Sequence, residues 1–239
     1  MTDLLAVELH HDGADLVSQL ALPAGPGPHP AVLVIHNAHG LGPHMVERAQ
    51  TLAAEGYAAL AVDMYGGGKY YPRPEEAGEP FMAVAGSPER LRSRVNAWLD
   101  CLKARPEVDA SRVAAIGYCF GGMCVLELVR TGADAKAVIS YHGILKTTAP
   151  AQPGAVKAKV AVYTGGKDPY APREDVVALE DEMIAAGADY QITTFGEAYH
   201  SFTDPNAADM GRPGIAYDPM AERMSWAGTL ELLKAVLVG

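Results

Sequence analysis

The sequence contains few cysteines, no excess of positive charge and no long hydrophobic run. Three cysteines, Cys101, Cys119 and Cys124, are an odd number in a chain of 239 residues, which argues against a disulfide framework and indicates reduced thiols. A formal net charge of −10 without any Lys/Arg-rich run argues against nucleic acid and anionic membranes as partners. No apolar stretch approaches the roughly 20 residues that span a bilayer. The acidic N-terminal stretch also lacks the features of a signal peptide, so we expect a soluble, cytoplasmic protein.

The composition is typical of a globular protein with one substantial core. Hydrophobic residues make up 49% of the chain and charged residues 20%, which excludes disordered, collagen-like and coiled-coil classes. A chain of this length can bury roughly 70–75% of its unfolded surface. Because α/β domains often reach about 250 residues, we expect residues 1–239 to form a single domain.

The order of the apolar segments predicts an α/β fold. Short runs at residues 4–9 and 15–22, separated by a polar turn with Gly13, predict an antiparallel hairpin. Continuous apolar runs, typical of buried parallel strands, then alternate with segments of helical periodicity. The expected strands are residues 31–35, 57–62, 112–116, 137–141, 160–164 and 190–195, and the expected helices are residues 45–55, 88–105, 121–130, 173–186 and 221–238. This pattern predicts a mostly parallel sheet with helices on both faces, whose ligands bind beyond the carboxyl ends of the strands.

Two segments match no regular element. Residues 64–86 are rich in Gly, Pro and Tyr, and we interpret them as a functional loop or lid. Their side chains Tyr65, Lys69, Tyr70 and Tyr71 either close over a substrate or belong to an ordered surface loop, and the sequence favours neither alternative. Residues 204–219 are irregular, and Arg212 among them is a candidate cation of a binding pocket.

Cys119 lies in a pattern that is typical of a nucleophile elbow. Gly117-Tyr118-Cys119-Phe120-Gly121 follows an expected strand and precedes an expected helix, which is the G-x-S-x-G arrangement with cysteine in place of serine. A sharp strand-to-helix turn lifts the nucleophile out of the backbone and requires small flanking residues. The N-terminus of the following helix also favours a thiolate. The alternative is a structural turn that contains a buried thiol.

An acid and a histidine follow Cys119 in the order that an α/β-hydrolase requires. Asp168 comes directly after the expected strand at residues 160–164, and His200 comes after the strand at residues 190–195. Each residue alone is more often an ordinary loop residue. Because all three lie at the carboxyl ends of parallel strands and occur in the order nucleophile, acid, histidine, they predict a Cys-His-Asp triad.

The three motifs around these residues resemble the dienelactone hydrolase family of α/β-hydrolases. They are GYCFGG at residues 117–122, GGKD at 165–168 and YHSF at 199–202, and the similarity extends from the strand at residues 31–35 through the last helix. The resemblance implies that Cys119 is the nucleophile, that His200 is the general base and later the acid, and that Asp168 orients the imidazole.

The resemblance also implies an oxyanion hole, and four side chains are expected to bind the substrate. The oxyanion donors are expected to be the backbone N–H groups of Ala38 and Phe120. The side chains expected to contact the substrate are those of Asn37, His39, Tyr118 and Ser201.

The sequence departs from the family at two positions. Asn37 occupies a position where family members commonly carry a glutamate that takes part in generating the thiolate, and an amide cannot accept that proton. Asp204 lies four residues after the expected catalytic histidine, where some members carry an arginine that holds a substrate carboxylate. These two positions put recognition of a carboxylated dienelactone in doubt.

The other histidines and cysteines favour structural roles over metal binding. His36, His39 and His44 lie close together, but their spacing across a glycine-rich loop matches no common zinc pattern. We therefore expect no metal and no cofactor. His142 and Cys124 are interpreted as structural residues, since a buried free cysteine usually packs as a small hydrophobe.

Together these features favour a carboxymethylenebutenolidase-like hydrolase. We expect it to cleave a small ester, lactone or enol-lactone through an acyl-cysteine intermediate. The alternative is a non-catalytic ligand-binding or thiol-sensing protein on the same fold, because fold alone does not determine function.

Overall fold

The computed structural model describes residues 4–239 and contains one eight-stranded sheet. The strands lie in the order β1-β2-β4-β3-β5-β6-β7-β8. They are β1 (Leu4–His11), β2 (Ala14–Ala21), β3 (His29–Ile35), β4 (Ala58–Val62), β5 (Val108–Tyr118), β6 (Ala137–Tyr141), β7 (Lys159–Gly165) and β8 (Tyr190–Phe195). The pairs β1–β2 and β2–β4 are antiparallel, and the remaining neighbours are parallel. The expected N-terminal hairpin and the mostly parallel sheet are therefore confirmed.

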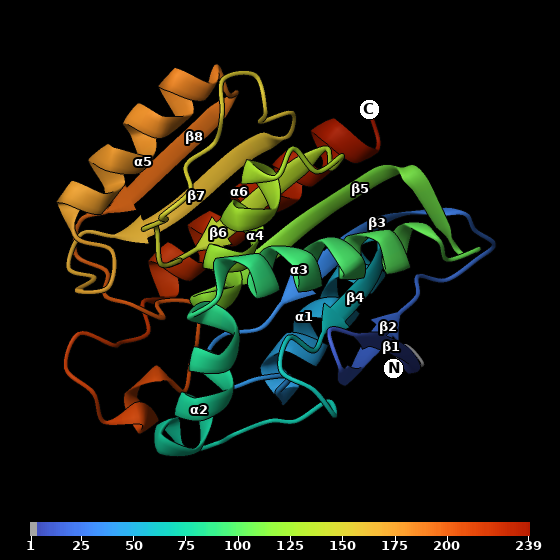
Figure 1. Cartoon of the computed structure of the whole chain (residues 1–239), viewed down its shortest axis with the longest axis horizontal. Helices are drawn as coiled ribbons and strands as arrows, with labels where there is room; N and C mark the ends of the chain where they lie inside the picture. The colour runs from blue at the N-terminus through green and yellow to red at the C-terminus, as the bar shows by residue number, and fades with distance from the viewer. Residues whose placement is uncertain (1–3) are drawn as a thin grey trace.

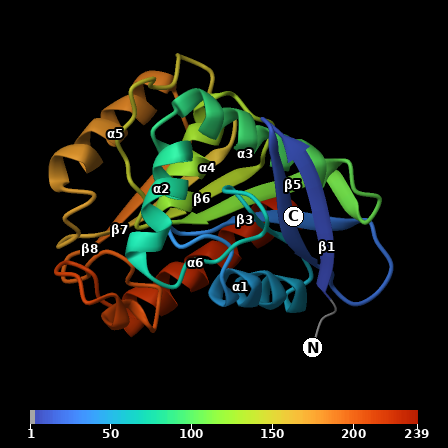
Figure 2. The same cartoon turned by 60° about the horizontal axis from the view of Figure 1, so that its bottom comes forward.

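Helices cover both faces of this sheet. They are α1 (Pro43–Ala54), α2 (Pro74–Ala85), α3 (Pro88–Lys103), α4 (Phe120–Arg130), α5 (Arg173–Ala186) and α6 (Pro219–Leu237), with a short 3₁₀ turn η1 (Ala207–Met210) before α6. In Figure 2, α3, α4 and α5 lie on one side of the sheet, while α1 and α6 lie on the other. Among residues 4–239, no helix combines the length and apolar character that a membrane crossing requires.

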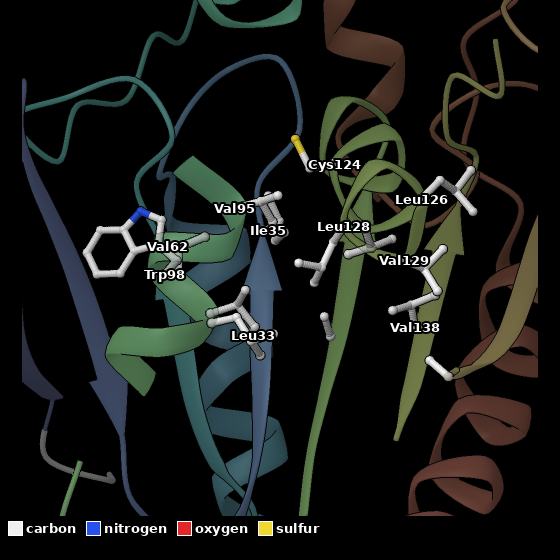
Figure 3. Close-up of a cluster of buried hydrophobic side chains, with 14 of the residues drawn as sticks. Leu33, Ile35, Val62, Val95, Trp98, Cys124, Leu126, Leu128, Val129 and Val138 are labelled. Carbon is white, nitrogen blue, oxygen red and sulfur yellow. The ribbon is translucent and has the colours of Figure 1, made fainter. Parts of the chain in front are cut away.

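The sheet and its helices enclose two hydrophobic cores. In one core, the strand residues Leu33, Ile35 and Val62 pack against Val95 and Trp98 of α3, and side chains of α4 complete it (Figure 3). The other core lies between the opposite face of the sheet and helices α1 and α6. Since both faces of the central strands are buried, their sequences are continuously apolar rather than alternating.

The interpretation of residues 64–86 as a loop is wrong in its second half. Helix α2 begins at Pro74, has Glu75 and Glu76 in its first turn, and ends at Ala85. Its apolar residues Ala77, Phe81 and Val84 recur at helical spacing, and Val84 is buried. Gly78 and Pro80 obscured this periodicity, because glycine and proline are the poorest helix formers. The segment before α2 remains irregular, and α2 lies at the same end of the sheet as the segment between β8 and α6 (Figures 1 and 2).

Asp63 holds that irregular segment in place. It follows β4, and its carboxylate accepts hydrogen bonds from the backbone N–H groups of Tyr65, Gly66 and Gly68 at 2.7–2.8 Å. It also accepts one from Val17 of β2 at 3.1 Å. Because a buried carboxylate requires such partners, Asp63 fixes where the chain turns toward the pocket. Tyr65 is thereby directed inward, and its hydroxyl donates to the carbonyl oxygen of Ala38 at 3.1 Å.

Candidate active site

Cys119 occupies a strained turn between β5 and α4. Its backbone has φ 54° and ψ −111°, a left-handed conformation that non-glycine residues rarely adopt. The turn closes because its neighbours are glycines. A Cβ atom on Gly117 would lie 2.0 Å from the carbonyl oxygen of Gly121, and one on Gly121 would lie 2.2 Å from that of Ile35. This geometry is that of a nucleophile elbow, with the partly exposed Cys119 at its apex.

The close approach of α4 to β3 predicts that Gly121→Ala destabilises the fold. The added methyl group has only backbone to displace, so we expect the free energy of unfolding to fall by about 1–3 kcal/mol. Urea unfolding, followed by circular dichroism, measures this change. Gly196→Ala is the matched control, because a Cβ atom on Gly196 would have no heavy atom of another segment within 4 Å. An unfolding midpoint for Gly121→Ala equal to that of the control would contradict the steric argument.

Asp168 and His200 form a buried pair beside Cys119. Asp168 follows β7 and His200 follows β8, and the His200 Nδ1 atom lies 2.8 Å from Asp168 Oδ2. The other carboxylate oxygen, Oδ1, accepts a hydrogen bond from the backbone N–H of Tyr170 at 2.8 Å. The main chain of His200 is held between the carbonyl of Gly214 and the N–H of Ala216. With Nδ1 directed at Asp168, the Nε2 atom of His200 is left to interact with Cys119.

The electrostatics of the site favour a thiolate–imidazolium pair. Burial raises the pKa of the Cys119 thiol, but the charge of His200 and a hydrogen bond to it outweigh burial and bring the pKa below its ordinary value. For His200, burial lowers the pKa, but Cys119 and Asp168 overcome this effect and raise it to about 10. Each group therefore stabilises the charged form of the other.

The backbone N–H groups expected to form an oxyanion hole lie around the same sulfur. Hydrogen bonds from Phe120 and Ala38 contribute to lowering the pKa of Cys119. Phe120 is the first residue of α4, and Ala38 lies in the loop after β3. Two N–H donors directed at the nucleophile are suited to hold an oxygen that becomes negatively charged when the nucleophile attacks.

A pocket of about 400 Å³ opens at Cys119. Of the expected substrate-binding residues, Asn37, His39 and Ser201 line it, together with Arg212. Most other lining side chains are apolar, and they come from α2, the loop after β6 and the segment before α6: Ala77, Phe81, Ile144, Met210 and Ile215. Residues 64–86 therefore contribute to the pocket, as expected, but they do so through helix α2 and not through a loop.

Tyr118 does not lie in this pocket, contrary to expectation. It is only 1% exposed and points to the opposite side of the sheet, where its ring stacks on Tyr141 at 4.7 Å. Successive residues of a strand point to opposite faces. Since Cys119 is lifted out of the strand by the elbow, its preceding residue is directed into the core.

The loop after β3 is ordered by its own histidines and Asn37. The Asn37 Oδ1 atom accepts a hydrogen bond from the backbone N–H of His39 at 2.9 Å. The Nδ1 atom of His39 lies 2.8 Å from the carbonyl oxygen of Tyr71, and the N–H of Tyr71 donates to the carbonyl of His39 at 2.8 Å. These bonds join the loop to the segment that precedes α2. Of the described residues, those that line the pocket at Cys119 include none of Tyr65, Lys69, Tyr70 and Tyr71, whereas Tyr70 lies in the wall of a second pocket.

His36 and His142 are buried in different surroundings near the site. His36 is buried, accepts a hydrogen bond from the N–H of Met64, and its pKa is lowered by burial to about 4. His142 is buried behind His200, with ring centres 5.2 Å apart, and its Nε2 atom lies 2.8 Å from Thr203 Oγ1. Within residues 4–239, no three His, Cys, Asp or Glu side chains gather in a way that could hold a metal ion.

Cys124 packs in the core, as the sequence predicted. It is buried on α4 among the residues of Figure 3, and burial raises the pKa of its thiol well above the ordinary value.

Tyr170 was not predicted as a site residue. Its ring lies 4.7 Å from that of His200 and it lines the pocket. Its position directly after Asp168-Pro169 was the only signal available in the sequence.

The comparisons with known proteins agree with this geometry. Residues 16–237 match the model of the dienelactone hydrolase family. A solved dienelactone hydrolase-like promiscuous phosphotriesterase from metagenomic libraries is 36% identical, covers 98% of both chains and superposes with a TM-score of 0.93. A Bradyrhizobium protein named probable 2-oxo-3-(5-oxofuran-2-ylidene)propanoate lactonase is 26% identical over 98% of this chain and 94% of its own.

A more distantly related solved structure has the same fold. The dienelactone hydrolase of Anabaena variabilis, at 21% identity, covers 99% of both chains with a TM-score of 0.72, which shows the fold alone. The family match extends over nearly the whole chain and includes the elbow and both of its partner loops. The chain is therefore a hydrolase that belongs to the dienelactone hydrolase family of α/β-hydrolases.

Proposed function

We propose that this hydrolase cleaves a small ester, lactone or enol-lactone through an acyl-cysteine intermediate, with Cys119, His200 and Asp168 as its triad. The observation that carries the proposal is the arrangement around the sulfur. Cys119 lies at the apex of the elbow, interacts with a histidine that is itself held by Asp168, and receives two backbone N–H groups. Each of these features is what nucleophilic acyl transfer requires.

The first half of the reaction forms the acyl-enzyme. The Cys119 thiolate attacks the carbonyl carbon, and the resulting oxyanion is held by the N–H groups of Ala38 and Phe120. His200 then donates its Nε2 proton to the leaving oxygen, so the C–O bond breaks as a thioester to Cys119 remains. Asp168 keeps the imidazole in the tautomer that presents Nε2 to the reaction.

The second half releases the acid. His200, now neutral, removes a proton from water, and the hydroxide attacks the thioester carbonyl. The thiolate of Cys119 leaves, and the proton on His200 restores the ion pair. Because a thiolate is itself a good leaving group, activated acyl groups such as enol esters should react more readily than amides.

Pre-steady-state hydrolysis of an activated ester, such as p-nitrophenyl acetate, tests the proposal. We expect a burst of product equal to the amount of enzyme, followed by steady turnover. A burst without turnover would support the alternative of a protein whose thiol is acylated but does not catalyse hydrolysis. If neither a burst nor steady turnover is observed, the proposal is wrong.

Carboxylated substrates should not be preferred. The carboxylate of Asp204 occupies the position where an arginine would be needed, and the chain carries a net charge of −10. For the neutral and carboxylated forms of one lactone, we expect kcat/KM to be roughly three- to tenfold higher for the neutral form. A few weak electrostatic interactions produce a ratio of this size. A preference for the carboxylated form would instead assign an anion contact to Arg212, which lines the catalytic pocket.

A further inference from the structure

A second pocket adjoins the catalytic pocket. It has a volume of about 340 Å³ and shares Asn37, His39 and Met210 with the pocket that contains Cys119. Because these three residues line both spaces, the two pockets lie next to each other. Cys119 and His200 do not line the second pocket, so it is suited to binding and not to chemistry.

The charge of this second pocket is negative. Asp204 and Asp209 line it, and the Asp204 Oδ1 atom accepts a hydrogen bond from the N–H of Asn206 at 2.9 Å. Among the residues that the structure describes, no lysine or arginine lines this space, and neither carboxylate forms an ion pair. Arg212 lines the catalytic pocket instead.

The neighbouring basic groups do not neutralise these carboxylates. Arg48 packs over Trp226 and is paired with Glu222 at 2.6 Å. His44 is part of the pocket wall, and burial together with the charge of Arg48 lowers its pKa, which favours the neutral ring at pH 7. The two carboxylates are therefore left to attract a positive group from solution.

An aromatic ring completes the pocket. Tyr70 lines it and is 48% exposed. Its ring packs directly over Gly42, where a Cβ atom would lie 2.6 Å away. The main chain beside it is fixed, because the N–H of Leu41 donates to the carbonyl of Lys69 at 3.0 Å. An exposed aromatic ring and carboxylates in the wall of one pocket form a combination that is suited to ammonium groups.

We propose that the second pocket is a subsite for a substrate group that carries an ammonium cation, bound by Asp204, Asp209 and the face of Tyr70. This inference rests on the proposed hydrolysis of esters at Cys119. It adds a substrate class: an acyl compound whose reacting end is apolar, to suit the catalytic pocket, and whose far end is positively charged.

Matched thioesters test the inference. Acetylthiocholine and its uncharged isostere, S-(3,3-dimethylbutyl) thioacetate, differ only in the charge of the end group, and a second pair with a four-carbon linker varies the reach. Acid release is followed with a pH indicator, since disulfide reagents would modify Cys119. For at least one pair, we expect kcat/KM to favour the cationic member by roughly fivefold or more, the size of a few exposed cation–π and charge contacts.

Three substitutions and one control locate the effect. Asp204→Asn keeps the acceptor for the N–H of Asn206 but removes the charge, and Asp209→Asn removes the second charge. Each should reduce the preference for the cation roughly two- to threefold, and Tyr70→Leu, which removes the aromatic ring, should reduce the ratio of the two kcat/KM values by a similar factor. Asp181→Asn removes the same charge from an exposed position on α5 outside both pockets and should leave the preference unchanged.

The outcomes separate this inference from the proposed function. If the neutral thioesters are hydrolysed with a burst but neither cationic member is preferred, the subsite is wrong and the acyl-cysteine mechanism stands. The same conclusion follows if Asp181→Asn lowers the preference as much as Asp204→Asn, since the effect would then come from the net charge alone. If no thioester and no activated ester is hydrolysed, the proposed function itself fails.

Discussion

Replacing Cys119 by alanine should reduce ester hydrolysis by roughly 10⁴-fold or more, the scale on which loss of a triad nucleophile acts. Cys119 is the residue at the apex of the elbow, and the N–H groups of Ala38 and Phe120 converge on its sulfur. Without the sulfur, no acyl group can be carried by the enzyme. Steady-state hydrolysis of p-nitrophenyl acetate measures the loss, and mass spectrometry of the quenched enzyme should show an acetyl group on wild-type Cys119 only.

The other two cysteines are the controls for this experiment. Cys124 is buried in the core under the sheet, and burial raises the pKa of its thiol well above the ordinary value. Cys101 lies on α3, and burial likewise raises its pKa. Cys124→Ala and Cys101→Ser should therefore retain most of the activity. Acylation of either residue, or full activity of Cys119→Ala, would show that the reaction does not proceed through the elbow.

The arrangement of Cys119, His200 and Asp168 could be predicted from the sequence because it depends on local features. The elbow needs small residues around Cys119, and the glycines that meet this need, Gly117 and Gly121, can be read directly from the sequence. Asp168 and His200 each follow a continuous apolar run, and parallel strands bring their carboxyl ends to one edge of the sheet. Topology then places residues far apart in the sequence within 2.8 Å, as for His200 and Asp168.

The walls of the pocket could not be predicted in the same way. Helix α2 was hidden by Gly78 and Pro80, which weaken the local helical signal, although packing of Val84 and Phe81 against the core stabilises the helix. Tyr118 was misplaced because a residue next to a nucleophile in sequence lies on the other side of the strand. The second pocket is formed by three segments, around His44, Tyr70 and Asp209, and only their tertiary arrangement brings them together.

The second large effect concerns the protonation of the resting site. The pKa of Cys119 is lowered mainly by His200, and the pKa of His200 is raised to about 10 by Cys119 and Asp168. At a pH above the lowered pKa of Cys119 and below the raised pKa of His200, the pair is a thiolate and an imidazolium. Alkylation by iodoacetamide should therefore reach its plateau at a lower pH than it does for an ordinary thiol, whose pKa is about 8.5. The rate should fall only as the pH drops through the lowered pKa of Cys119.

Removing His200 should change both this profile and the activity. In His200→Ala the burial of Cys119 remains while its main stabilising charge is lost, so the pKa of the thiol should rise to or above about 8.5. Hydrolysis should fall by roughly 10³–10⁴-fold, as is typical when one member of a triad is lost. Asp168→Asn should reduce hydrolysis by a similar factor, because the imidazole loses the partner that fixes its tautomer. If the alkylation profile of His200→Ala matches that of the wild type, the resting ion pair does not exist.

Substitutions of Asn37 test whether this ion pair forms without the glutamate that the family resemblance implies at this position. In Asn37→Glu a carboxylate would lie in the wall of the pocket that contains Cys119, and its negative charge would oppose thiolate formation. We expect slower alkylation at pH 7 than in the wild type. Asn37→Gln is the matched control, because it has the same length without the charge and should alkylate at the wild-type rate. Equal rates in both variants would mean that the charge at residue 37 does not reach the sulfur. Slower alkylation in Asn37→Glu alone would show that an uncharged residue at this position is what allows Cys119 and His200 to remain ionised before the substrate arrives.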